Sequence, residues 1–289
     1  MHFILLAVLA LHDPALIRTA DAAIQSRQAV RTAASGILRD EAISSTALGR
    51  EMKYRVLVPD EYDKSLKRYP VLYLLHGLGG NYTDWTTRTN LAAYSRSLSL
   101  IIVMPEGESS WYTNSVDGAS KFEDYITTEL PADVIRKFRT INSRYGRSIA
   151  GLSMGGYGAL KLALKRPAQF AVVGAFSGAF SITQDLETQL GAADAAGVKT
   201  IFGAADSQTR KDNDVFMLAA TMKPAGAPYV YIDCGIADGL LQTNREVARS
   251  IHKAGIAYEY HEVAGAHTWD YWDRRIRVFL PILMTRLAN

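Results

Sequence analysis

The stretch Ser148–Leu164, SIAGLSMGGYGALKLAL, decides the fold that this sequence predicts. It begins as a short apolar run, which is typical of a buried strand, and ends with the apolar spacing of a helix. Between the two halves lies Gly151-Leu152-Ser153-Met154-Gly155, a G-x-S-x-G element. In such a strand-to-helix turn the backbone is crowded, so glycine is needed on both sides of the serine, whose hydroxyl is held at the carboxyl edge of the sheet. We therefore expect Ser153 to be a nucleophile.

The sequence on either side of this stretch alternates between strand-like and helix-like patterns from about residue 50. The segments 70–77, PVLYLLHG, and 100–107, LIIVMPEG, are continuous apolar runs, as in strands that are covered on both faces. The segment 122–138 has helical spacing, with a kink or break expected at Pro131. This alternation predicts an α/β fold with a mostly parallel central sheet and helices on both faces.

The domain organisation expected from these patterns is one catalytic domain at residues 50–289, with an irregular, cap-like insertion at about 181–222. Residues 1–22 read as a signal peptide and residues 23–49 as an N-terminal leader segment. The apolar run Phe3–Leu11 is too short to span a bilayer but fits a secretory segment, and Ala20-Asp21-Ala22 offers a cleavage site. A secreted or periplasmic location is therefore expected. Because no Lys or Arg precedes the run, a cytoplasmic location is left open.

Composition argues against several classes of function. The 32 basic and 29 acidic side chains give a net charge of +3 without a massed basic surface, so nucleic acid is not an expected partner. Cys234 is the single cysteine, which excludes an intramolecular disulfide and a thiolate metal cluster. We expect no metal and no organic cofactor.

The general base that a serine nucleophile requires is sought among six histidines. His267, in AGAHTWDYW, falls in a loop after the last predicted strand and before the last helix, where the α/β-hydrolase order Ser, acid, His puts the base. The other histidines fit less well: His2 and His12 lie in the expected signal peptide, His76 in a loop ahead of the serine, His252 on a helix and His261 on a strand.

The acid that orients the base should follow a strand between Ser153 and His267. Asp238, in DCGIADGLL, meets this expectation because it lies in a short turn between a strand and a helix. Asp233, at the end of the same strand, and Asp206, in the irregular region, remain as weaker alternatives.

The segment LLHGLGG, residues 74–80, is a Gly-rich turn after an early strand, as in an oxyanion hole. We expect the backbone N–H of Leu78, with Gly79 second, and the N–H of Met154 to face the reacting carbonyl. A phosphate-binding loop is the other interpretation, but no Gly-Lys-Ser/Thr follows.

Together these motifs resemble the esterase D-like branch of the α/β hydrolases, which includes tributyrin-type carboxylesterases, S-formylglutathione hydrolases, feruloyl and acetylxylan esterases, and mycolyl transferases. The matching pieces occur in family order over most of residues 50–285: YRVLVPDEYD, PVLYLLHGLGGNYTDW, SWYTNS, FEDYITTELP, IAGLSMGGYGAL, IDCGIADGLL and GAHTWDYW.

The resemblance implies a catalytic triad of Ser153, Asp238 and His267, and Leu78 and Met154 as oxyanion donors. It implies a serine carboxylesterase that cleaves short-chain or aryl esters through an acyl-enzyme. Formylglutathione hydrolases usually carry Thr-Cys after the His-Gly-Leu turn, and Gly79-Gly80 here makes that substrate less expected.

Aromatic residues lie beside these motifs and suggest an apolar or aryl pocket, with core packing as the simpler explanation. The expected substrate-binding residues are Gly79, Trp111, Tyr112 and Trp269. The expected partner is a small-molecule ester, without a membrane span and with a homo-oligomer left open. The alternative functions are an acyltransferase that uses the same acyl-enzyme and a feruloyl or acetylxylan esterase that acts on plant cell-wall esters. A non-catalytic binding protein is a further, less expected alternative.

Overall fold

The computed structural model describes residues 38–184 and 192–287. The predicted signal peptide therefore lies outside the described residues. The strands are β1 (Leu38–Ser45), β2 (Arg50–Leu57), β3 (Val71–Leu75), β4 (Ile101–Pro105), β5 (Arg147–Leu152), β6 (Val172–Phe176), β7 (Tyr229–Gly235) and β8 (Tyr258–Val263). The α-helices are α2 (Asp84–Arg88), α3 (Leu91–Ser95), α4 (Phe122–Asp124), α5 (Leu130–Lys137), α6 (Met154–Lys165), α7 (Ala192–Phe202), α8 (Gln208–Asp212), α9 (Val215–Thr221), α10 (Leu241–Lys253) and α11 (Trp269–Arg286).

The strands form one eight-stranded sheet in the order β1-β2-β4-β3-β5-β6-β7-β8. β2 pairs antiparallel with both β1 and β4, and every other neighbouring pair is parallel. The mostly parallel sheet is thus confirmed, and the fold is that of the α/β hydrolases. Because parallel strands end at the same edge, the carboxyl ends of β5, β6, β7 and β8 bring their following loops together.

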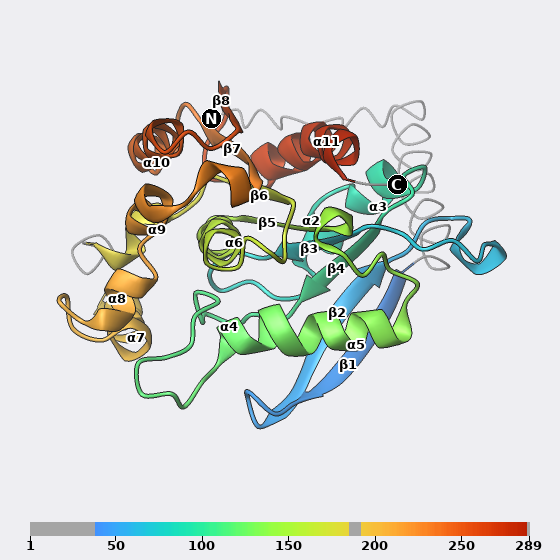
Figure 1. Ribbon diagram of the computed structural model, residues 1–289, viewed down its shortest axis with the longest axis horizontal. Coiled ribbons are helices and arrows are strands. Elements are labelled where there is room, and N and C mark those ends of the chain that lie inside the picture. Colours follow the sequence, from blue (N-terminus) through green and yellow to red (C-terminus); the bar gives the residue numbers. More distant parts are fainter. Residues whose placement is uncertain (1–37, 185–191, 288–289) are drawn as a thin grey trace, which may run out of the picture. The chain divides into compact units, whose positions relative to one another are not determined.

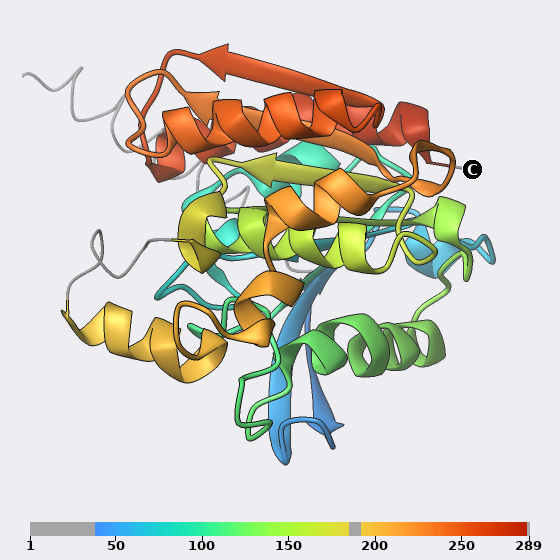
Figure 2. The same cartoon turned by 60° about the vertical axis from the view of Figure 1, so that its left-hand side comes forward.

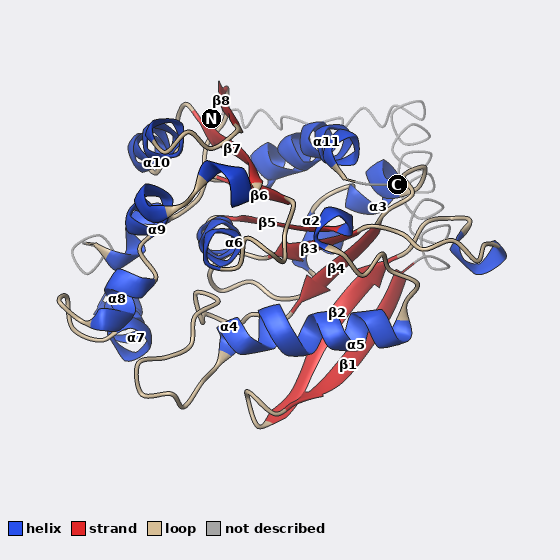
Figure 3. Ribbon diagram, in the orientation of Figure 1, coloured by secondary structure: helices blue, strands red, loops and turns tan. Residues whose placement is uncertain are grey.

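Helices cover the two faces of this sheet (Figures 1 and 3). On one face α6 packs against β5 and β6, and α9 lies beside both α6 and α10, which packs against β7. On the other face α11 packs against β6, β7 and α3. Figure 2 shows the orange helix α9 between α10 and α6. Every residue of β3, β4 and β6 is buried, as expected for strands covered on both sides.

Three features differ from the expectations. The sheet begins with β1 at Leu38, ahead of the expected domain start at residue 50, because this edge strand is polar and mostly half-buried, so its pattern is weak. Pro131 does not end the helical stretch: residues 122–137 are helical throughout, but the α-helical pattern is interrupted by a π-helical turn at Tyr125–Glu129 just before Pro131, where the missing N–H is tolerated. The expected insertion contains α7, α8 and α9, and α9 is part of the helical layer on the α6 side.

None of the helices in residues 38–184 and 192–287 is long and apolar enough to cross a membrane.

Candidate active site

Ser153 lies between β5 and α6 in a backbone conformation that few residues adopt, with φ 53° and ψ −117°. The flanking glycines permit this turn, as predicted. A Cβ at position 155 would come within 2.5 Å of the carbonyl oxygen of His76, and one at position 151 would collide with the backbone of Gly155. The turn is closed by hydrogen bonds from Ser153 N to the Phe176 carbonyl at 2.9 Å and from Tyr157 N to the Ser153 carbonyl at 3.0 Å.

The structure brings Ser153, His267 and Asp238 into one hydrogen-bonded chain. The Ser153 hydroxyl lies 2.9 Å from His267 Nε2, and His267 Nδ1 lies 2.9 Å from Asp238 Oδ2. Because a carboxylate can only accept, Nδ1 carries the proton and Nε2 is free to accept the serine proton. The three residues follow β5, β7 and β8, all at the carboxyl edge of the sheet.

Asp238 is held by more than the histidine. Its Oδ1 accepts a hydrogen bond from the Leu240 amide at 2.9 Å, and its side chain is fully covered, whereas the His267 side chain is 37% exposed. Burial alone would raise the pKa of Asp238, but hydrogen bonds from His267, Leu240 and the Ser177 hydroxyl, with the charge of His267, keep it below its usual value. The carboxylate therefore stays ionised beside the imidazole.

The alternative acids lie elsewhere. Asp233 is completely buried and accepts hydrogen bonds from Arg275, Tyr231 and Tyr271, at 2.8, 2.9 and 2.9 Å. It therefore ties β7 to α11 and does not reach His267. Asp206 is exposed in the connection between α7 and α8.

The other histidines of the described residues lie outside the hydrogen-bonded chain of Ser153, His267 and Asp238. His76 is buried; its Nδ1 donates to the Gly77 carbonyl at 2.8 Å and its Nε2 accepts from the Gly107 amide at 2.9 Å, so it shapes the loop, as expected. His252 lies exposed on α10, and His261 lies on β8 against Glu259.

The expected oxyanion donors lie around the serine. Gly77–Gly80 is a turn closed by a 3.1 Å hydrogen bond from the Gly80 amide to the Gly77 carbonyl, with a φ of +68° at Gly79 that favours glycine. A Cβ at Gly77 would lie 3.6 Å from that of Ser153, so this turn rests directly on the nucleophile. Among the hydrogen bonds of the described residues, the amides of Leu78, Gly79 and Met154 have no acceptor, which leaves them available to a ligand.

The expected substrate-binding aromatics divide into two groups. Trp269 is partly exposed and stacks edge-on against Trp272, at 5.3 Å between ring centroids. Trp111 and Tyr112 are buried, both at φ 53°. The Tyr112 hydroxyl donates to the His76 carbonyl at 2.9 Å, and the Tyr112 carbonyl accepts from the buried Lys161 ammonium at 2.6 Å. The structure thus places Tyr112 behind the Gly77–Gly80 turn and not on an open surface near Ser153.

Sequence reasoning did not find Ser177, whose hydroxyl accepts from Trp272 Nε1 at 3.3 Å, or Trp272, whose ring packs edge-on against that of His267 at 4.9 Å between centroids. Ser177 stands in the otherwise ordinary strand-end sequence AFSGAF. Its left-handed backbone, with φ 48°, has no signal in a single sequence.

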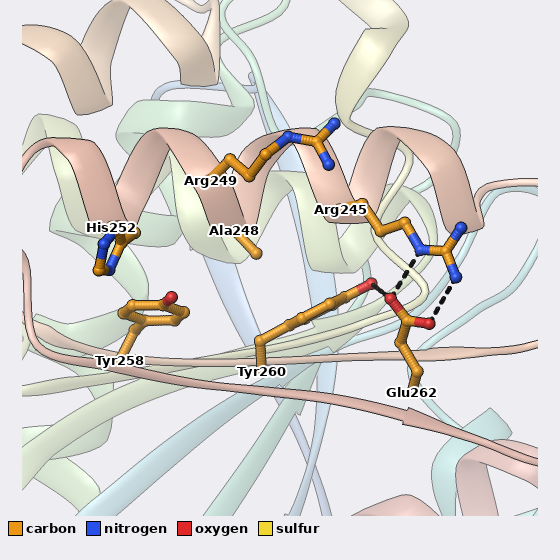
Figure 4. A pocket seen from close by; sticks show the side chains of 7 residues that line it. All are labelled: Arg245, Ala248, Arg249, His252, Tyr258, Tyr260 and Glu262. Carbon is orange, nitrogen blue, oxygen red and sulfur yellow. Dashed lines mark hydrogen bonds and ion pairs between the residues drawn. The ribbon is translucent and has the colours of Figure 1, made fainter.

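A separate groove, of about 580 Å³, lies between α10 and β8 (Figure 4). In it Arg245 makes a two-pronged ion pair with Glu262, which also accepts from the Tyr260 hydroxyl. Figure 4 shows Tyr258 beside His252 at the other end of the groove. None of the three residues of the hydrogen-bonded chain lines it, so we do not assign it to the active site.

Within the described part of the chain, no group of three His, Cys, Asp or Glu side chains is arranged to hold a metal ion.

Comparison with known proteins identifies relatives over most of the chain. The Esterase family model matches residues 45–281. An acetyl esterase of Caldicellulosiruptor saccharolyticus is 30% identical over 235 residues, which are 76% of this chain and 88% of that protein. An esterase of Mycobacterium tuberculosis is 33% identical over 78% of this chain, and the chain spans about half, 54%, of that protein. A diacylglycerol acyltransferase/mycolyltransferase of Mycobacterium leprae is 27% identical over 85% of this chain and 83% of its own.

Among solved structures, the fluorophosphonate-binding serine hydrolase F of Staphylococcus aureus superposes with a TM-score of 0.76. It is 26% identical, and the match covers 85% of this chain and 97% of that one. With a family model that matches most of its length, this chain belongs to the Esterase family of α/β hydrolases and is a serine carboxylesterase.

Proposed function

We propose that this enzyme hydrolyses short-chain carboxylic esters through an acyl-enzyme formed on Ser153. The observation that carries the proposal is the hydrogen-bonded chain from Asp238 through His267 to Ser153, with both links at 2.9 Å. A serine hydroxyl at its normal pKa is a weak nucleophile, and a base within this distance, oriented by a carboxylate, is the arrangement that activates it.

In the first half-reaction, His267 Nε2 takes the hydroxyl proton while Ser153 Oγ bonds to the ester carbonyl carbon. The carbonyl electron pair moves to its oxygen, and the amides of Leu78 and Met154 donate hydrogen bonds to the resulting oxyanion. When the carbonyl re-forms, the alkoxide leaves and takes the proton from Nε2. A water molecule then repeats the sequence on the acyl-enzyme, releasing the acid and restoring the serine.

Asp238 has two roles in this proposal. Its hydrogen bond to Nδ1 keeps the imidazole in the tautomer that can accept at Nε2, and its charge stabilises the imidazolium that forms in each half-reaction. The low pKa of its carboxyl fits the second role, because the group remains charged throughout.

The short-chain assignment draws on the acetyl esterase relative and on the apolar side chains around the site. Leu78, in the turn against Ser153, and Ile236, just before Asp238, are 37% and 58% exposed. Like the partly exposed Trp269, which follows His267, they are apolar side chains beside the site residues in the sequence and are not enclosed. Such surroundings suit a small acyl group better than a long chain that needs an enclosed channel.

An acyltransferase is the second candidate, because a mycolyltransferase is among the relatives. The first half-reaction would be unchanged, and an alcohol would replace water in the second. Product analysis with glycerol or a sugar as added acceptor separates the two: transfer that exceeds hydrolysis at modest acceptor concentration would favour the transferase.

The decisive experiment compares wild type with Ser153→Ala on p-nitrophenyl acetate, butyrate and octanoate, on methyl ferulate and on acetylated xylan. We expect acetate or butyrate to be the preferred ester and Ser153→Ala to lower kcat by roughly 10⁶-fold. A fluorophosphonate probe should label wild type and not the variant.

Ser148→Ala is the control, because Ser148 is a buried serine on β5, close to Ser153 in the sequence, and its hydroxyl donates to the Val71 carbonyl at 3.0 Å. It should keep wild-type activity and labelling. Absence of labelling in folded wild type, or comparable hydrolysis by Ser153→Ala, would refute the proposal.

A further inference from the structure

The two expected oxyanion donors come from separate segments of the chain, so the packing between these segments determines how the donors lie relative to each other. The Leu78 amide is in the turn after β3, and the Met154 amide is at the start of α6. The two segments meet at the His76 carbonyl, because a Cβ at Gly155 would come within 2.5 Å of its oxygen. A displacement of this carbonyl would therefore move one donor relative to the other.

The His76 carbonyl is held by a side chain from a third segment. Tyr112, in the loop after β4, is completely buried, and its hydroxyl donates to this carbonyl at 2.9 Å. The rings of Tyr112 and His76 also pack edge-to-face, at 5.9 Å between centroids and 62° between planes, which is a favourable geometry. Tyr112 thus contacts both the backbone and the side chain of His76.

The side chain of His76 in turn orients the Leu78 amide. Its Nδ1 donates to the Gly77 carbonyl at 2.8 Å, and the Gly80 amide donates to the same oxygen at 3.1 Å. The Gly77 carbonyl and the Leu78 N–H belong to one peptide unit, which is planar and trans. Fixing the carbonyl therefore also fixes the direction of the N–H, which points the opposite way.

Tyr112 is itself held in one position by α6. Its backbone has φ 53°, a conformation that surroundings have to enforce, and its carbonyl accepts from Lys161 Nζ, on α6, at 2.6 Å. A Cβ at Gly158 would come within 2.5 Å of the Tyr112 ring, and a Cβ at Gly107 would collide with the ring from the β4 loop. The ring therefore has no room to turn, and its hydroxyl has a single direction.

We propose that Tyr112 is a positioning residue that holds the Leu78 and Met154 amides at the separation needed to bind the oxyanion. The proposal rests on the function proposed above. Lys161 fixes Tyr112 to the helix that begins at Met154. The Tyr112 hydroxyl fixes the His76 carbonyl, which leads into the turn that carries Leu78. Because Tyr112 is buried behind this turn, it acts on the transition state through the two amides and not by contact with the substrate.

The test is Tyr112→Phe in the full chain, which removes the hydroxyl and keeps the ring. On p-nitrophenyl acetate, kcat should fall about 10-fold while KM stays within about twofold, because the oxyanion forms only after the ground-state complex. This loss is smaller than the loss of about 10²–10³-fold that follows when an oxyanion donor is removed entirely.

Phenyl trifluoromethyl ketone gives a readout that is specific for the oxyanion. Ser153 Oγ bonds to its carbonyl carbon, His267 takes the hydroxyl proton, and the carbonyl oxygen becomes an oxyanion. The inhibition constant should rise in Tyr112→Phe by about the same factor as kcat/KM falls. A tyrosine that only stabilises the fold would leave both values unchanged in the folded protein.

Tyr54→Phe is the matched control. Tyr54 is as buried as Tyr112, and its hydroxyl donates to Asp133 Oδ2 at 2.6 Å, between β2 and α5. The variant loses a buried tyrosine hydrogen bond without a contact to the oxyanion turn. It should lower stability and keep the wild-type kcat and inhibition constant.

Lys161→Met is the second variant if Tyr112→Phe folds poorly. It removes the group that holds the Tyr112 carbonyl, while Glu123 keeps its ion pair with Lys165 at 2.8 Å. We expect kcat to fall about fivefold and the inhibition constant to rise by the same factor.

Wild-type kcat and an unchanged inhibition constant in the folded Tyr112→Phe or, in its place, Lys161→Met would overturn the proposal. An equal fall of kcat in Tyr54→Phe would also overturn it, because the effect would then follow stability. A wild type that neither hydrolyses esters nor reacts with a fluorophosphonate would instead refute the proposed function, so the two failures are distinct.

Discussion

Two aspartates at the end of β7 have similar burial but different partners. Asp233 and Asp238 are 0% and 5% exposed, and each accepts several hydrogen bonds. The partners of Asp233 are an arginine and two tyrosines, none of which exchanges a proton near neutral pH. The main partner of Asp238 is His267, an imidazole that can gain and lose a proton near neutral pH. Its other nitrogen, Nε2, lies within hydrogen-bond distance of the Ser153 hydroxyl.

The comparison shows that burial and hydrogen bonding do not by themselves make a carboxylate functional. At Asp233 the charge is balanced by the neighbouring Arg275, and this ion pair stabilises the packing of α11 against β7. At Asp238 the balancing charge appears only when His267 takes a proton. The difference lies in the partner, and substitution of each aspartate should therefore affect different properties.

The largest expected effect is on catalysis by Asp238→Asn. The amide preserves the size of the side chain but cannot hold the imidazole in the required tautomer, so kcat should fall by about 10⁴-fold. Steady-state kinetics on p-nitrophenyl acetate measure this, and circular dichroism should show an unchanged fold. A fall of less than tenfold would mean that Asp238 does not orient the base.

Asp233→Asn is the matched change at the other carboxylate. It leaves Arg275 buried without its counter-charge, so the free energy of unfolding should fall by roughly 3–5 kcal/mol, measured by the denaturant midpoint. The folded fraction should retain kcat within a few-fold. If Asp233→Asn lost activity and Asp238→Asn lost mainly stability, the two assignments would have to be exchanged.

The pH dependence of stability sharpens the same contrast. The folded-state pKa of Asp238 is below its ordinary value of 3.8, so its ionised form stabilises the fold. That contribution is present above the ordinary value and is lost as pH falls through the folded pKa. Relative to Asp238→Asn, wild type should therefore be more stable by roughly 1–2 kcal/mol at pH 6, and this advantage should disappear in acid. Urea unfolding of both proteins from pH 6 to pH 2 gives the measurement.

The smallest expected effect extends the contrast to two tryptophans. Trp269→Leu changes a partly exposed residue, and should alter the ratio of butyrate to acetate hydrolysis by about threefold to tenfold. Trp111→Leu changes a buried residue and should lower stability without altering that ratio. Equal changes in the ratio for both variants would show that acyl preference is not determined by direct contact.

Much of this site could be predicted from the sequence because its motifs mark the ends of strands. Gly151 and Gly155 identify the turn that carries Ser153, and the loops after β7 and β8 locate Asp238 and His267. The preference for Asp238 over Asp233 followed from loop position alone, since the sequence does not show that Arg275 lies opposite Asp233.

Other features depend on contacts that no local pattern records. The direction of the Tyr112 side chain follows from φ 53° at two successive residues, which turns it behind the Gly77–Gly80 turn. Ser177 depends on a similar left-handed backbone, and β1 is a polar edge strand whose partner, β2, defines it. In each case a tertiary contact determines a conformation that the residue would not prefer by itself.

The backbone at Ser153 has an implication for how this enzyme could evolve. A side chain at φ 53° and ψ −117° is held against its own preference, at a cost of about 1–3 kcal/mol. Glycine would adopt the same conformation without that penalty, so the inactive Ser153→Gly variant should melt at a higher temperature than its active parent. Drift toward greater thermostability would thus favour the loss of the nucleophile, and only selection for the reaction keeps a serine at this position.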